Sequence, residues 1–306
     1  MYLAPLNYDR YFKKVFSDMR IAKRFLEDFL DIQILELTYL NDKINITDDA
    51  QTVEFDFRCK TPEGSFIIEM QQWYKPDVVQ RFYVYHAIGA ALQLEDMPKK
   101  LIPLPDGKTR SVRDYSELLP TITIIWMVHD TLGFTDDYVS FVLTPEYISE
   151  FIRDAREWNT AKCKELVSRR EKLLELLTNS EKNIDFLSKN KLIYAFQKNI
   201  VANKKHRKYF DWFELAEKTL KKISEKFEFD QYEQDEILRE VVRKLKKELT
   251  EEDSEGYIKI FEEYTLGVLR YERGIEKKVM KKAQSEIDEA KIREEEAKIR
   301  EENERQ

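Results

Sequence analysis

Residues 54–73 read EFDFRCKTPEGSFIIEMQQW, which is two apolar runs around a short turn with acidic residues inside them. In the first run apolar and charged side chains alternate: Phe55, Phe57 and Cys59 with Glu54, Asp56, Arg58 and Lys60. A period of two places these two sets on opposite sides of a strand. The segment 61–64, Thr-Pro-Glu-Gly, has the composition of a turn. We therefore expect a β-hairpin in which Asp56 faces away from the core.

The turn also predicts the register of the hairpin. The expected opposite pairs are Lys60 with Ser65, Arg58 with Ile67, Asp56 with Glu69, and Glu54 with Gln71. Opposite residues of an antiparallel pair project from one face with Cβ atoms about 5 Å apart, so the carboxylates of Asp56 and Glu69 should converge.

Two facing carboxylates destabilise a sheet unless a cation lies between them. The pair therefore predicts that Asp56 and Glu69 are ligands of Mg²⁺ or Mn²⁺, with waters and phosphate oxygens completing the coordination. The alternative is a hairpin whose polar face is simply in water, where the acids lie apart or pair with Arg58.

The flanking sequence predicts an alternation of helices and strands. Apolar spacing indicates a helix over 8–30 with Asn7 as its cap, and Pro76 suits the first turn of a second helix. The prolines within 98–107 predict a loop. Strands are expected at 32–40, 121–128 and 138–143, and 121–128 is apolar on both faces, as in the middle of a covered sheet.

Beyond Pro145 helix formers dominate, and the heptad EAKIREE occurs twice, at 289–295 and 296–302. Its seven-residue period is typical of a coiled coil. The best seam loses its hydrophobicity halfway along, which favours a lone charged helix: Met280, Ala283, Ile287, Ala290, Glu294, Ala297. The expected organisation is an α/β core over 1–145, a mostly helical region over 146–272 and a charged C-terminal helix over 273–306.

Composition sets limits on the class of protein. The 306 residues are 42% hydrophobic, contain two cysteines and include no apolar run near the roughly 18 residues that span a membrane. We expect a cytoplasmic protein without disulfides. The net charge of −7 counts against nucleic acid as a partner, although basic residues cluster at 198–208, where a solvated helix end or loop is the alternative reading. The sequence has no glycine-rich phosphate loop and no serine or cysteine nucleophile motif.

Three motifs occur in order along the first part of the chain. Residues 9–16 read DRYFKKVF, residues 68–71 read IEMQ, and 81–85 carry Arg and Tyr four apart. Together with the hairpin they resemble the PD-(D/E)XK nuclease superfamily, in its recombination-promoting nuclease and putative transposase branch. The resemblance covers about residues 5–145. It implies a three-layer, restriction-endonuclease-like α/β core with a mixed sheet, and metal-dependent hydrolysis of DNA phosphodiester bonds.

The resemblance also implies roles for individual residues. Asp56 and Glu69 take the positions of the metal ligands, with the backbone carbonyl of Met70 as a further candidate. Gln71 stands where the superfamily usually has a lysine, and an amide carries no charge to offset the charge of the phosphorane. Arg81, an always-charged group on the following helix, is the candidate replacement.

Two further residues have alternatives that the sequence leaves open. Tyr85 shares a helix face with Arg81 and is placed to bond a phosphate or orient a carboxylate. The alternative is an ordinary surface cation beside a half-buried tyrosine. Asp9 is a candidate to approach the metal from the first helix, and the alternative is a first-turn acid paired with Lys13.

The resulting expectation is a metal-dependent DNA endonuclease linked to recombination or mobile elements. Its partner would be DNA, without a membrane, and a homodimer through the C-terminal helix stays open. The main alternative is a catalytically weak or inactive nuclease-fold protein that acts as a DNA-binding or assembly module. A third reading is a helical scaffold with a small sheet.

Overall fold

The computed structural model describes residues 2–40, 43–44, 53–73, 75–105, 108–160, 163–177, 184–220 and 226–247, with isolated positions between 266 and 288. The chain divides into two compact units, Met1–Lys247 and Glu248–Gln306. The predicted C-terminal helix over 273–306 and its repeat lie largely outside the described residues, so the coiled coil stays a prediction.

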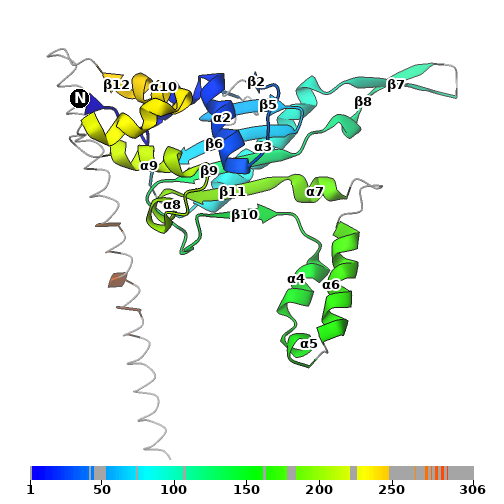
Figure 1. Cartoon of the computed structure of the whole chain (residues 1–306). Coiled ribbons are helices and arrows are strands. Elements are labelled where there is room, and N and C mark those ends of the chain that lie inside the picture. Colours follow the sequence, from blue (N-terminus) through cyan, green and yellow to red (C-terminus); the bar gives the residue numbers. More distant parts are fainter. Residues whose placement is uncertain are drawn as a thin grey trace, which may run out of the picture. The chain divides into compact units, whose positions relative to one another are not determined.

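A six-stranded mixed sheet forms the centre of the first unit (Figure 1). Its strands, in spatial order, are β10 (Tyr138–Val142), β11 (Lys191–Phe196), β9 (Thr121–Met127), β6 (Gly64–Gln71), β5 (Phe57–Thr61) and β2 (Thr38–Tyr39). Strands β6, β9 and β11 are parallel, and the remaining pairs are antiparallel. The mixed α/β architecture confirms the fold class expected from the sequence.

Helices cover both faces of this sheet. On one face lies α3 (Val78–Asp96), whose Val78 and Phe82 form a buried cluster with Ile125 of β9. Neighbouring residues of a strand point to opposite faces. Trp126 accordingly packs on the other face, against aromatic rings of α1 (Asp9–Phe16), α2 (Met19–Leu30) and α9 (Phe210–Thr219). The core therefore has three layers.

Close contact between α3 and the sheet depends on Gly89. A Cβ at this position would lie 2.3 Å from Cδ1 of Ile67 in β6. One turn away on the helix, Nδ1 of His86 lies 2.9 Å from the hydroxyl of Thr123 in β9. The small residue lets α3 lie directly over β6 and β9, the two strands at the centre of the sheet.

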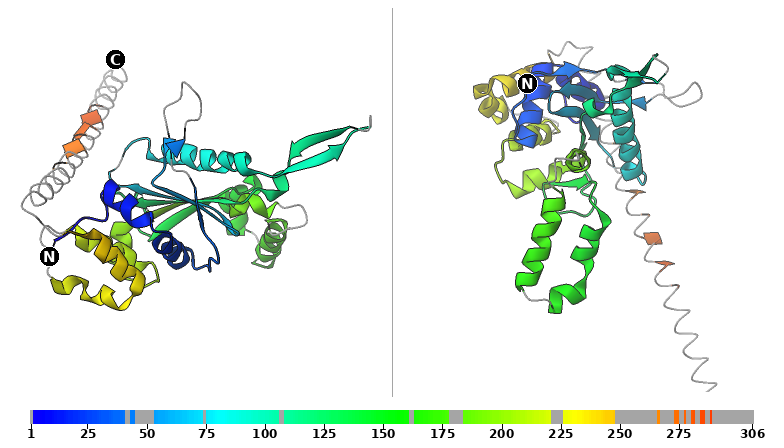
Figure 2. Two further views of the ribbon diagram at one scale, coloured as in Figure 1. Left: turned by 90° about the horizontal axis from the view of Figure 1, so that it is seen from above. Right: turned by 90° about the vertical axis from the view of Figure 1, so that its right-hand side faces the viewer.

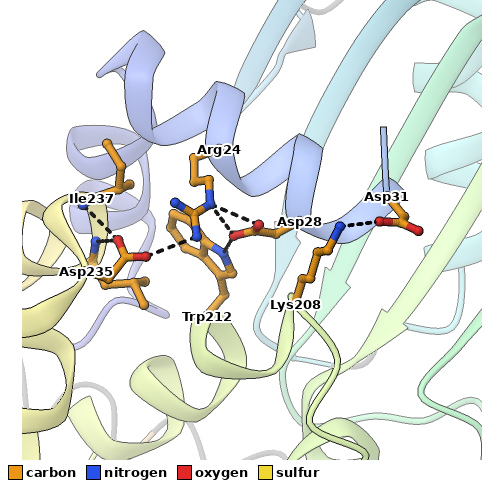
Figure 3. Close-up of polar contacts among 8 residues, drawn as sticks. Arg24, Asp28, Asp31, Lys208, Trp212, Asp235 and Ile237 are labelled. Carbon is orange, nitrogen blue, oxygen red and sulfur yellow. Dashed lines mark hydrogen bonds and ion pairs between the residues drawn. The ribbon is translucent and has the colours of Figure 1, made fainter. Parts of the chain in front are cut away.

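Polar contacts join α2 to the later helices of the same unit (Figure 3). Arg24 donates to Asp28 at 2.9 Å and to Asp235 at 3.0 Å, and Trp212 of α9 also donates to Asp28, at 2.8 Å. Asp235 is the N-cap of α10 (Glu236–Leu245) and accepts hydrogen bonds from two of its backbone N–H groups. The segment after the sheet is thus fixed to the first helices.

The remaining strands and helices lie outside the six-stranded sheet and the helices that cover it. Short strands pair as β1 (Tyr2–Leu3) with β12 (Lys246–Lys247), β3 (Lys43–Ile44) with β4 (Val53–Glu54), and β7 (Lys99–Pro103) with β8 (Thr109–Arg113). The remaining helices are η1 (Tyr115–Glu117), α4 (Glu146–Arg153), α5 (Ala155–Thr160), α6 (Cys163–Leu177), α7 (Asp185–Lys189), α8 (Gln197–Asn203) and η2 (Lys226–Gln234). Among the described residues, none of the helices combines the length and the apolar character that a membrane span requires.

Three details differ from the sequence-based expectation. The helix over 8–30 is two helices, because Asp18 begins a new one by accepting from the Arg20 N–H. Asn7 is fully buried and is not a cap, since α1 starts after Tyr8. Within the expected loop at 98–107, Lys99–Pro103 form strand β7 of a two-stranded ribbon. In addition, the expected helical range 146–272 contributes strand β11 to the middle of the sheet.

Candidate active site

The hairpin of β5 and β6 has the register predicted from its turn. Lys60 lies opposite Ser65 and Arg58 opposite Ile67, and the ladder ends at the next pair. The predicted pair of Glu54 with Gln71 is wrong. Glu54 belongs to β4 and lies opposite Lys43 of β3, because the chain bends between β4 and β5.

The bend is at Asp56, and it brings Asp56 and Glu69 together through backbone hydrogen bonds. The N–H of Asp56 donates to Oε1 of Glu69 at 3.2 Å. In the other direction, the N–H of Met70 donates to Oδ2 of Asp56 at 2.7 Å. The two carboxylates converge at the end of β6, as the register indicated.

The burial of the acid pair excludes the alternative in which the polar face of the hairpin is exposed to water. Glu69 is 4% exposed and Gln71 is 5% exposed, and the side chain of Asp56 is 10% exposed. They lie on the face of β6 that carries Ile67, which α3 covers. The polar face is therefore enclosed between two layers, and the reading of a solvated face is wrong.

Enclosure changes the ionisation of both acids. Burial raises the pKa of Asp56 to about 7, opposed by the hydrogen bond from Met70 and assisted by the charge of Asp9. Burial, followed by the charge of Asp56, raises the pKa of Glu69 well above its usual range. Two buried carboxylates this close resist being ionised together unless a cation compensates them.

Lys13 of α1 provides one such cation. Its Nζ lies 2.8 Å from Oε1 of Glu54, 3.4 Å from Oδ1 of Asp9 and 3.5 Å from Oδ1 of Asp56. Partial burial acts to lower the pKa of Lys13, but the hydrogen bond to Glu54 and the charges of Asp56 and Asp9 raise it overall. Lys13 therefore stays protonated beside the carboxylate pair.

From the sequence, Lys13 is expected only as a helical partner of Asp9. The available signal was its position in the first motif, DRYFK, which resembles the opening of the nuclease branch. Asp9 itself is 63% exposed and forms that ion pair, and its charge also raises the pKa of Asp56. Asp9 thus lies at the edge of the acid site and pairs with Lys13 as well.

Gln71 and Arg81 meet on the same side of the sheet. Nη2 of Arg81 donates to Oε1 of Gln71, and Nε2 of Gln71 donates to the backbone carbonyl of Trp73. The charge of Arg81 also acts to lower the pKa of Glu69. Nε of Arg81 is buried and has no hydrogen-bond partner within the described part of the chain. One N–H donor of this guanidinium therefore lacks an acceptor among these residues.

Tyr85 lies one turn after Arg81 and contacts it through its ring. The guanidinium carbon is 5.9 Å from the centroid of Tyr85 and 4.5 Å from that of Phe82. Burial, followed by the charge of Glu69, raises the pKa of the Tyr85 hydroxyl. The hydroxyl therefore keeps its proton at neutral pH and can donate it in a hydrogen bond.

The donor set fits a hard divalent cation. Among the described residues, no group of three or more histidine, cysteine, aspartate or glutamate side chains is arranged to hold a metal ion. Mg²⁺ characteristically uses one or two carboxylates and takes its other ligands from water and phosphate. Asp56 and Glu69, buried and resistant to joint ionisation, meet that requirement with oxygen atoms alone.

A mixed sheet between helical layers, with an acid pair at the end of a hairpin, is the architecture of restriction-endonuclease-like proteins. Residues 6–104 match the family model described as PD-(D/E)XK nuclease family transposase. The match confirms the resemblance shown by the three motifs over this part of the chain. Comparison with curated proteins and with solved structures gives no match.

Proposed function

We propose that the protein is a divalent-metal-dependent endonuclease that hydrolyses DNA phosphodiester bonds during recombination or movement of mobile elements. The observation that supports this most strongly is the convergence of Asp56 and Glu69 in an enclosed site beside two cations, Lys13 and Arg81. A hairpin needed only for folding gains nothing from burying two like charges, which costs several kcal/mol per uncompensated ion.

Asp56 and Glu69 are the residues that would hold Mg²⁺ or Mn²⁺, and they would release their protons on doing so. A metal held there would lower the pKa of a water and would neutralise charge that develops on the phosphate. Tyr85 keeps its hydroxyl proton and would donate it in a hydrogen bond to a phosphate oxygen or to Glu69. Asp9 adds negative charge at the edge of the site.

Arg81 and Lys13 supply the positive charge that Gln71 lacks. Gln71 holds the guanidinium of Arg81 in place, which leaves the buried Nε of Arg81 as a donor for a phosphate oxygen. Lys13 stands on the other side of the acid pair, next to Asp56. In a site that contains little water, fixed positive groups stabilise the transition state more than the ground state when they lie next to the atoms on which negative charge develops.

The alternative function is a nuclease-fold protein that binds DNA or assembles without cutting. The amide of Gln71 at the usual lysine position is the observation that favours it. DNA is the proposed partner in both cases. A cytoplasmic location and a homodimer through the C-terminal helix stay predictions.

Cleavage of supercoiled plasmid distinguishes the two functions. We expect nicking by the wild type in Mg²⁺ or Mn²⁺, none in EDTA, and loss of at least a hundredfold in the Asp56→Asn and Glu69→Gln variants. Glu95→Gln, an exposed acid at the far end of α3, is the matched control and should cut at the wild-type rate. An inert wild type that still binds DNA would favour the non-catalytic function.

A further inference from the structure

Strands β7 and β8 form a two-stranded ribbon that extends away from the helices and sheet (Figures 1 and 2). Its ladder runs from the pair Lys99–Arg113 to the pair Pro103–Thr109. The β7 residues are all exposed, and on β8 only Val112 is half-buried. The ribbon therefore presents both of its faces to solvent.

The ribbon is strongly basic within an acidic protein. Residues 99–113 contain five basic side chains and one acidic one, whereas the whole chain has a net charge of −7. The basic residues are Lys99, Lys100, Lys108, Arg110 and Arg113. Asp114, at the base of the ribbon, forms an ion pair with Lys100. The ribbon thus carries a net positive charge, unlike the chain as a whole.

The register distributes these cations over both faces. Opposite residues share a face, so Lys99 and Arg113 lie on one face, whereas Ile102 and Arg110 lie on the other. A ribbon that covered a core would instead carry apolar residues on one face. Because charges occur on both sides, the arrangement suits a partner that surrounds the ribbon rather than one that covers a single face.

We infer that the β7–β8 ribbon is an arm that binds duplex DNA. The major groove of B-DNA admits a two-stranded β-ribbon, and its two walls carry phosphates that can meet cations on both faces. This inference rests on the proposed function for its choice of DNA as the partner. It adds a second contact surface outside the acid site.

The length of α3 sets the distance between this arm and the acid site. Arg81 lies near the start of α3, and Asp96, fifteen residues later, ends the helix just before β7. At 1.5 Å per residue this is about 22 Å. A duplex that follows α3 advances about six or seven base pairs over that distance, at roughly 3.4 Å per base pair. The arm therefore contacts DNA to one side of the bond at the acid site.

Fluorescence anisotropy with the full chain in EDTA tests the arm without cleavage. The ribbon variant carries Lys108→Gln, Arg110→Gln and Arg113→Gln. The matched control removes the same number of exposed cations from α6: Lys164→Gln, Arg170→Gln and Lys172→Gln. Circular dichroism melts establish that both variants fold as the wild type does.

For a 30-base-pair duplex we expect the ribbon variant to bind at least tenfold more weakly than the wild type. Its slope of log affinity against log salt should fall by about 2 to 3, near 0.9 per lost phosphate contact. The control should match the wild type.

Equal affinity and equal salt slope for the ribbon and control variants would overturn the inference, and the exposed Leu101 and Ile102 would then point to a protein partner. Failure of the proposed function looks different. A wild type that cuts no plasmid but loses DNA affinity through the ribbon variant would refute the nuclease activity and support the arm. A ribbon variant that cuts and binds as the wild type does would refute the arm alone.

Discussion

Nζ of Lys13 lies 3.5 Å from Oδ1 of Asp56, although α1 packs on the face of the sheet opposite to α3. A cation from one layer thus reaches an acid that the other layer encloses. The strand position that usually carries lysine in the superfamily carries Gln71 here. The ammonium group beside the acid pair comes from a helix instead.

The Lys13→Gln variant should lose activity while keeping its affinity for DNA. Removing one preorganised donor from a reacting centre typically costs about 10²–10³ in rate. We expect single-turnover cleavage to slow by about a hundredfold, with partial recovery in Lys13→Arg because the charge is restored. Lys23→Gln on α2, where Nζ of Lys23 lies 3.9 Å from Glu27, is the control. A Lys13→Gln variant with wild-type turnover would remove Lys13 from the site chemistry.

Metal-free protein should become less stable as the pH rises from about 4 to about 7. The folded pKa of Asp56 is about 7, above its ordinary value of 3.8, so unfolding releases a proton in this range. The Asp56→Asn variant lacks this titrating group, so its free energy of unfolding at pH 8 should exceed that of the wild type by on the order of 2–4 kcal/mol. Urea unfolding of both proteins at pH 5 and pH 8 measures these free energies. Equal pH dependence in the two proteins would contradict the raised pKa.

Divalent metal should stabilise the wild type more at pH 8 than at pH 5. Protons compete with the cation for Asp56 and Glu69, whose pKa values are both raised. At pH 8 a metal at a hundred times its Kd contributes about 2.7 kcal/mol. Thermal melts with and without Mn²⁺ measure the increase in Tm at each pH. In the Asp56→Asn variant Mn²⁺ should change the Tm little at either pH.

Restoring the superfamily lysine by Gln71→Lys should harm the protein. The new ammonium would face Arg81, which loses the acceptor that now holds its guanidinium. An unsatisfied buried donor costs about 1–3 kcal/mol, and like charges add to that. The double variant Gln71→Lys with Arg81→Gln should recover most of the lost stability. If Gln71→Lys alone is as stable as the wild type and cuts faster, the Gln71–Arg81 pair has no positioning role.

Gly89→Ala should push α3 away from the sheet. The added Cβ would lie 2.3 Å from Cδ1 of Ile67, and overpacking of this kind costs about 1–3 kcal/mol. Ile67→Val removes the clashing methyl group, so the double variant should be more stable than Gly89→Ala alone. Denaturant midpoints of the two single variants and the double variant test this. Additive losses would show that the two side chains do not meet.

The hairpin and its register could be predicted from the sequence because both are local. Alternation over Val53–Lys60 and a turn four residues long fix which residues are opposite, and Arg58 indeed pairs with Ile67. The bend at Asp56 could not be predicted in this way, because it depends on the pairing of β4 with β3. In that pairing Glu54 lies opposite Lys43. The acids still converge as predicted, because Asp56 directly precedes the last ladder pair, Phe57 with Ile68, and is bonded to Glu69 and Met70 through backbone N–H groups.

Features made by distant segments could not be predicted in this way. Lys13 reaches Asp56 across 43 positions, and no periodicity within α1 indicates that contact. Strand β11 carries a five-residue apolar run, LIYAF, among helix formers, and such a run is equally typical of a buried helix. The ribbon was not predicted because its prolines are typical of loops. Proline is nevertheless tolerated in a strand that lies at the edge of a sheet.

The position of β9 between β6 and β11 has a consequence for synthesis. β11 follows β9 by about 60 residues, so at about 5–20 residues per second the ribosome delivers it roughly 3 to 12 s later. During that delay the nascent chain carries β9, apolar on both faces, with one edge unpaired, and such an edge is where aggregation starts. We expect chaperones to protect the growing chain until Phe196 has emerged, and a premature stop near residue 145 to yield an insoluble fragment.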